Sequence, residues 1–76
     1  MKTVEKTALS RTLLVLLKEL SEECQDTLKL ISHLEIKDLT AEQVASILSE
    51  LTVSVTHLHV HTENLQDLIN DEIERL

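Results

Sequence analysis

The fold is decided by nine residues near the middle of the chain, Ile36-Lys37-Asp38-Leu39-Thr40-Ala41-Glu42-Gln43-Val44. Thr40 is placed to accept a hydrogen bond from the first amides of a helix. Gln43, three residues later, can return a side-chain bond to the backbone, which is the pattern of a capping box. We therefore predict a loop over about 36–39 and a helix over about 40–75. A loop this short makes the helices on either side of it antiparallel neighbours.

Apolar residues on both sides of this loop recur at helical spacing. The stripe before it comprises Leu13, Leu17, Leu20, Cys24, Ile31 and Leu34, and the stripe after it Val44, Leu48, Leu51, Val55, Leu58, Thr62, Leu65 and Ile69. A stripe of this kind buries one face of a helix, so we predict a first helix over about 4–35 and one hairpin domain over 1–76. Residues 51–62 also alternate as a strand does. The second stripe stays in phase through them, which favours helix.

The composition restricts the class of protein. The 76 residues include no Gly, Pro, Phe, Tyr or Trp, and a single Cys. Phosphate-binding loops need Gly, disulfide frameworks need several cysteines, and stacking platforms for single-stranded nucleic acid need aromatic residues. We therefore expect an all-α protein, cytoplasmic or at least intracellular. The apolar run 13–17 is too short for a secretory leader or a membrane span.

The charge is acidic and unevenly distributed. The net charge is −7, with +3 in residues 1–18 and −10 in residues 19–76. An acidic chain repels nucleic-acid phosphate and anionic membranes. An antiparallel hairpin would place the basic N-terminal residues beside the acidic residues of 63–76, so we expect these opposite charges to pair within the protein.

Histidine is the residue type that points most directly to chemistry. His57 and His61 are four residues apart, the spacing of two-ligand zinc helices. No zinc motif and no second cysteine supplies the remaining ligands, so we expect no metal and no cofactor, and assign these histidines to a helix flank or an interface. His59 belongs to the same group, and His33, near the loop, is expected on the surface.

No residue pattern indicates catalysis. Cys24 falls in the first apolar stripe, where a thiol is buried and unreactive. The acidic neighbours Glu22 with Glu23, and Asp71 with Glu72, point apart on a helix and are expected to be solvated. We therefore expect a protein that is not an enzyme.

The first residues carry one resemblance. Met1 with the run 5–9, Glu-Lys-Thr-Ala-Leu, resembles the opening of the Rop family of small plasmid RNA-binding hairpins. That resemblance implies two antiparallel helices that dimerise into a four-helix bundle. It covers five contiguous residues of 76, and the chain lacks the aromatic residue that the family stacks against RNA. It serves as an architectural analogy.

A two-helix hairpin cannot cover all the apolar surface of this chain. Residues 13–17 are apolar all round the helix, and a helix of that kind must be covered on every side. We therefore predict a homodimer that forms a four-helix bundle. Its expected interface comprises Leu13, Leu14, Leu16, Leu17, Val53, His57, Leu58 and Val60.

The function expected from this architecture is non-catalytic. The leading hypothesis is a protein–protein interaction or small regulatory module that binds a second copy and another protein's helices. One alternative is a Rop-like RNA-binding bundle that uses its basic end at Lys2, Lys6, Arg11 and Lys18. The other is a metal or pH sensor built on histidine. Binding to nucleic acid or to membrane is not expected under the leading hypothesis.

Overall fold

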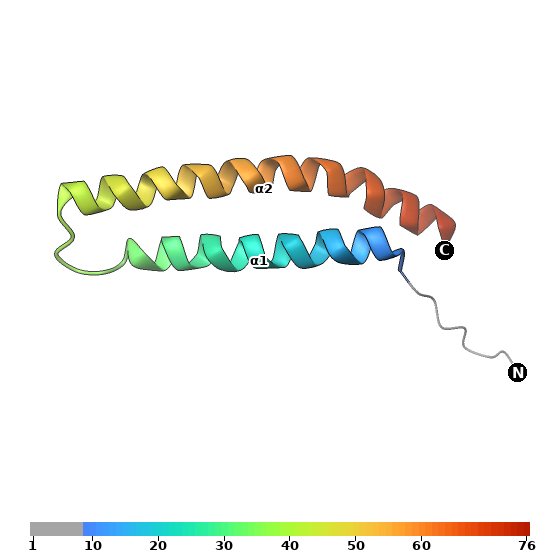
Figure 1. Ribbon diagram of the computed structural model, residues 1–76, viewed down its shortest axis with the longest axis horizontal. Helices are drawn as coiled ribbons and strands as arrows, with labels where there is room; N and C mark the ends of the chain where they lie inside the picture. Colours follow the sequence, from blue (N-terminus) through green and yellow to red (C-terminus); the bar gives the residue numbers. More distant parts are fainter. Residues whose placement is uncertain (1–8) are drawn as a thin grey trace, which may run out of the picture.

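The computed structural model describes residues 9–76, which form an α-helical hairpin (Figure 1). Helix α1 spans Arg11–His33 and helix α2 spans Ala41–Arg75. The two helices run antiparallel side by side over most of the length of α1. The predicted all-α hairpin is confirmed, and residues 51–62 are helical throughout.

Helix α1 begins later than the sequence predicted. Leu9 and Ser10 are not helical. Ser10 has an extended backbone, and its hydroxyl accepts a hydrogen bond from the Leu13 amide at 3.2 Å, so it caps the helix. The predicted start near residue 4 was wrong because Ser10 caps the helix, so that α1 begins directly after it. Residues 1–8 lie outside the described part of the chain.

The predicted capping box of the second helix is confirmed. The backbone amide of Gln43 donates to the Thr40 hydroxyl at 3.1 Å, and the backbone amide of Thr40 donates to the side-chain oxygen of Gln43 at 2.9 Å. The connection is nevertheless longer than predicted and runs over 34–40, because α1 ends at His33 in a series of short backbone turns. Asp38, with a φ of 63°, reverses the chain within it.

The register between the helices differs from the expected one. A loop centred near residue 38 would place residue i of the first helix opposite residue 76 − i of the second. The observed pairs are Ser10 with Glu72, Glu23 with His61 and Thr27 with Ser54. The partner in α2 therefore lies five to eight residues later than predicted. The cause is visible in Figure 1, where the first turns of α2 extend past the end of α1 and the connection runs back beneath them.

The helices meet along two rows of residues on each, which we call the inner rows. On α2 they are Val44, Leu51, Leu58, Leu65 and Glu72, and Ile47, Ser54, His61 and Leu68. On α1 they are Leu13, Leu20 and Thr27, continued by the C-cap residue Leu34, and Leu16, Glu23 and Leu30. All of these residues are buried or half-buried. Within residues 9–76, the only buried apolar residues are Leu13 and Leu65, which are 4% and 3% exposed.

One row on each helix was therefore predicted on the wrong side. The second stripe was expected to turn Leu48, Val55, Thr62 and Ile69 inward, and all four are exposed. Cys24 and Ile31, expected inside, are exposed as well. The chain instead turns the adjacent row inward and places polar residues between its own helices.

No helix within residues 9–76 has the length and apolar character that crossing a membrane requires.

Candidate interaction surfaces

A polar layer crosses the hairpin near its middle. Nδ1 of His61 lies against the carboxylate Oε2 of Glu23, and the other oxygen of that carboxylate is buried without a hydrogen-bond partner. One turn further along α1, the hydroxyl of Thr27 meets the hydroxyl of Ser54. Glu23 was expected to be solvated, and the structure corrects this because Glu23 occupies an inner row. Polar residues at such positions fix which residues of two helices face each other.

A second polar contact closes the open end of the hairpin. Glu72 as a residue is 7% exposed. Its Oε2 accepts a hydrogen bond from the Ser10 amide at 3.0 Å and from the guanidinium of Arg75. Glu72 was expected on the solvated surface. Counting in sevens from Val44 would have placed it in an inner row, so the sequence did contain the signal.

The acidic end of α2 forms an ion pair within its own helix. Glu72 forms its ion pair with Arg75 of its own helix. Lys2 and Lys6, which were expected to meet the acidic end of α2, fall outside the described residues.

One side of the hairpin is apolar. Each helix carries one further row directly beside its inner rows. A twofold axis perpendicular to the plane of the two antiparallel helices relates one helix to the other. The further rows of α1 and α2 therefore lie on the same side of the hairpin. We call this set the apolar face: Leu17, Cys24 and Ile31 on α1, and Leu48, Val55 and Ile69 on α2, where Thr62 lies between the last two. Ile31, Leu48 and Val55 are 43–52% exposed.

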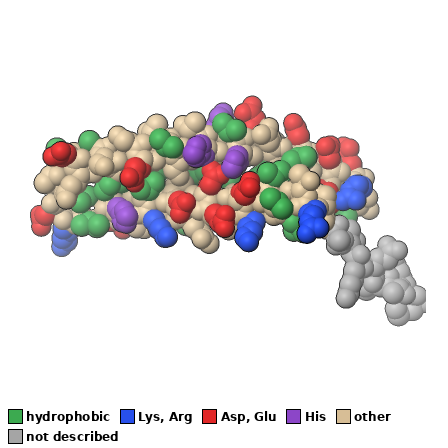
Figure 2. Space-filling model, viewed as in Figure 1, with side chains coloured by type: hydrophobic (Ala, Val, Ile, Leu, Met, Phe, Trp, Pro, Cys, Tyr) green, Lys and Arg blue, Asp and Glu red, His purple; other side chains and the backbone are tan. Residues whose placement is uncertain are grey.

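The opposite side is polar. The corresponding rows there, which we call the polar face, comprise Glu19, Asp26 and His33 on α1, and Gln43, Glu50, His57, Asn64 and Asp71 on α2. Figure 2 shows a side of the hairpin on which acidic and histidine side chains gather along the line between the helices, with basic side chains along the lower edge. The two sides of one small hairpin therefore differ sharply in chemistry.

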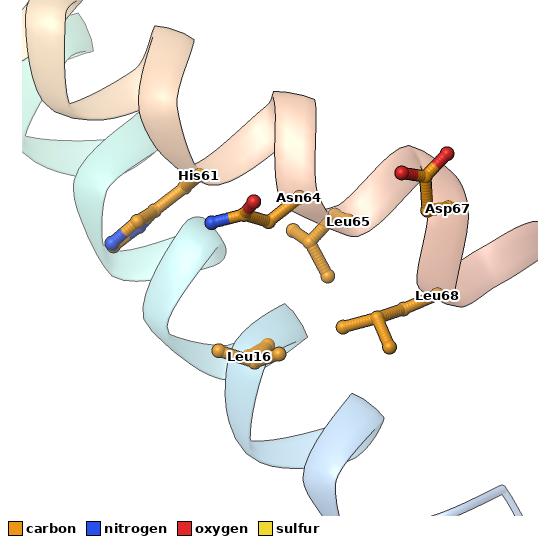
Figure 3. A pocket seen from close by; sticks show the side chains of 6 residues that line it. All are labelled: Leu16, His61, Asn64, Leu65, Asp67 and Leu68. Atoms are coloured by element: carbon orange, nitrogen blue, oxygen red, sulfur yellow. The ribbon is translucent and has the colours of Figure 1, made fainter.

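A groove opens toward the polar face near the open end of the hairpin. It has a volume of about 380 Å³ and is lined by Leu16, His61, Asn64, Leu65, Asp67 and Leu68. Figure 3 shows Leu16 of α1 and Leu65 and Leu68 of α2 directed into the space between the helices, with His61 and Asn64 along one edge. The floor is thus leucine, and the α2 edge carries amide and imidazole groups. Asp67 also lines the groove, with its carboxylate directed away from the leucines.

The expected interface residues are divided among these surfaces. Leu13 is buried and Leu16 and Leu58 are half-buried on the inner rows, so they hold the hairpin itself together. Leu17 lies on the apolar face. The remaining four, Leu14, Val53, His57 and Val60, are exposed, and Val53 and Val60 point away from the apolar face.

The histidines do not assemble with other ligating side chains. His61 meets one carboxylate, that of Glu23, and His59 lies 3.8 Å from Glu63 on the exposed side of α2. Within residues 9–76 there is no group of three or more His, Cys, Asp or Glu side chains placed to hold a metal ion. His57 and His33 are exposed.

Comparison with known proteins finds no matching family model, no similar curated protein and no similar solved structure.

Proposed function

We propose that this protein is a non-catalytic interaction module whose apolar face binds a second copy, giving a four-helix bundle. The observation that carries the proposal is the arrangement of apolar residues. Six of them lie in two rows on one side of the hairpin, broken on α2 only by Thr62, while the interior of the same hairpin contains Glu23, Thr27, Ser54 and His61. A chain selected to be stable as an isolated hairpin gains more by turning the apolar row inward.

The geometry of a four-helix bundle accounts for this choice. In such a bundle the residues nearest the central axis come from all four helices, whereas residues between neighbouring helices lie at its flank. With the apolar faces of two hairpins together, Val55 and Ile31 would lie near the axis. Ser54 and Glu23 would stay at the flank, close to water. The apolar stripes found in the sequence would then be the core of the assembly rather than of one chain.

Sedimentation velocity over micromolar to submillimolar concentrations tests the proposal. We expect a particle of twice the chain mass, and a melting temperature that rises with protein concentration, because association stabilises the folded chain by mass action. Val55→Glu introduces a charge on the apolar face and is expected to shift the protein to monomer and to lower its helicity.

Val53→Glu is the matched control. Val53 and Val55 are both valines of α2, 55% and 52% exposed, and they point to different sides. The control is expected to remain dimeric. A wild-type protein that stays monomeric and helical at every concentration contradicts the proposal. Dissociation by Val53→Glu but not by Val55→Glu would move the interface to the side expected from the sequence.

A further inference from the structure

We infer that the groove lined by Leu16, Leu65 and Leu68 takes a basic amphipathic helix of a partner protein, with an apolar side chain of that helix seated on the leucines. This inference goes beyond self-association, because the groove opens toward the polar face and stays accessible when the apolar face is covered. It rests on the proposed function only in requiring a folded hairpin.

The shape of the groove fits a helix. Its α2 wall consists of His61, Asn64, Leu65 and Leu68, which follow the spacing i, i+3, i+4 and i+7 of a single helical stripe. Its floor continues across Leu16 into a neighbouring hollow formed by Arg11, Thr12 and Val15 of the same helix. A third helix that lies in the groove would contact one stripe of residues on α1 and one on α2. Amphipathic helices bind in grooves by contacts of this kind.

Apolar surface beside the groove is available for such a partner. Val15 is 51% exposed and Val60 is 49% exposed. Val60 lies one turn before Asn64 on the same side of α2, and Val15 precedes Leu16. Neither valine is on the apolar face, so pairing of two hairpins leaves both uncovered. A partner helix in the groove would cover them and would give them the contacts that the hairpin does not.

The charge around the groove selects a basic partner. Besides the Glu72–Arg75 ion pair, residues 61–76 contain four acidic residues and no basic one. Asp67 is part of the groove lining itself. The facing segment of α1, residues 11–23, adds Glu19, Glu22 and Glu23 against two basic residues, Arg11 and Lys18. A helix with lysine or arginine beside its apolar stripe meets complementary charge here, which speeds encounter and excludes acidic partners.

Three labelled synthetic helical peptides of 18 residues test this inference by fluorescence anisotropy at 150 mM salt. The first has leucine at i, i+3, i+4 and i+7 positions and lysine at most others. The second keeps the leucines and replaces lysine by glutamate. The third keeps the lysines and replaces leucine by glutamine. We expect saturable binding of the first peptide only, because both the apolar stripe and the basic charge are required.

Variants of the groove locate the binding. Asn64→Phe fills the groove from an exposed position, and Asp67→Lys reverses a lining charge. Each is expected to weaken binding of the first peptide about tenfold or more, which corresponds to about 1.4 kcal/mol. The matched controls Asn70→Phe and Glu50→Lys make the same changes at exposed positions outside the groove and are expected to bind as the wild type does.

Sedimentation of every variant separates this test from the test of self-association. Equal binding of the first and third peptides overturns the inference, because it shows non-specific attraction between opposite charges. Equal weakening by groove variants and controls also overturns it. A change of oligomeric state in Asn64→Phe without loss of peptide binding would show that a second copy, and not a basic partner, occupies the groove. Monomeric wild-type protein that still binds the first peptide through the groove contradicts the proposed function alone.

Discussion

The hydroxyl oxygens of Thr27 on α1 and Ser54 on α2 lie 2.5 Å apart in the middle of the hairpin. The Thr27 hydroxyl also donates to the Glu23 carbonyl at 2.8 Å. Because the Thr27 hydroxyl uses its proton in that bond, the Ser54 hydroxyl donates the hydrogen bond between the helices and the Thr27 oxygen accepts it. Two residues 27 positions apart in the sequence are thereby held face to face by a directional bond.

Removing the Thr27 hydroxyl should therefore lower the unfolding free energy more than removing the Ser54 hydroxyl. Ser54→Ala leaves Thr27 bonded to the Glu23 carbonyl and should cost less than about 1 kcal/mol of unfolding free energy, whereas Thr27→Val removes the acceptor of Ser54 and should cost about 1–2 kcal/mol. Adding Ser54→Ala to Thr27→Val should restore part of the loss. Urea unfolding measures all three. Thr56→Val is the control, because the Thr56 hydroxyl bonds only to its own helix on the exposed side; a loss there equal to that of Thr27→Val would refute the cross-helix account.

The Glu23–His61 contact should be dispensable for stability. One oxygen of Glu23 is buried without a partner, and a partly buried polar contact that leaves such an atom unpaired often stabilises less than apolar residues of similar volume do. We expect the double variant Glu23→Leu, His61→Leu to raise the unfolding free energy by about 1–2 kcal/mol. Glu23→Leu alone should gain less, since His61 loses its partner. The exposed pair Glu22→Leu, His59→Leu is the comparison, and a gain of the same size there would assign the effect to general apolarity.

Glu72 should matter more than any neighbouring acidic residue. It is buried and accepts both the Ser10 amide and the Arg75 guanidinium. Glu72→Ala leaves a part-buried amide without its acceptor and should lower the unfolding free energy by about 1–3 kcal/mol. Glu74→Ala removes the same charge from an exposed position and should stay within about 0.5 kcal/mol of the wild type. Thermal and urea unfolding of the two variants decide the point, and equal losses would contradict the structural role of Glu72.

Asp38 offers a stabilising change. Its φ of 63° lies in the left-handed region, where a residue with a Cβ pays a cost that glycine does not. Asp38→Gly should leave stability unchanged or raise it by a few tenths of a kcal/mol, and Asp38→Ala should lower it by about 1 kcal/mol. Lys37→Ala, one residue earlier, should have no measurable effect. A stability order with alanine above glycine at position 38 would refute this account of the connection.

The sequence predicts the hairpin well because its strongest signals are local. The capping box at Thr40 and Gln43 and the long apolar stripes depend on residues a few positions apart, and both the box and the helices are present. The start of α1 was wrong because a serine cap at Ser10 outweighed a continuing helical pattern. The register was wrong because the path of the connection beneath α2 depends on tertiary contacts.

The inner side of the hairpin was harder to predict for a physical reason. Val44, Leu51, Leu58 and Leu65 are followed four residues later by an apolar row and three residues later by a row that contains Ser54 and His61. Apolar pattern alone selects the first of these rows. The hairpin places the second one inside, so hydrophobicity did not decide which side faces the partner helix. The groove could not be predicted at all, since it depends on which turns of α1 and α2 lie opposite each other.

The two adjacent rows on each helix also bear on how the chain reaches its fold. A modest rotation of α1 and α2 about their own axes would bring Ile31 and Val55 between them and expel Glu23 and Ser54. The same sequence is therefore compatible with two arrangements of the hairpin, and the more apolar one is not the one observed. Under the proposed pairing, a second copy covers the apolar rows. Under that proposal, binding of a second copy would select one of the two hairpin arrangements, and the chain without a partner would populate both arrangements.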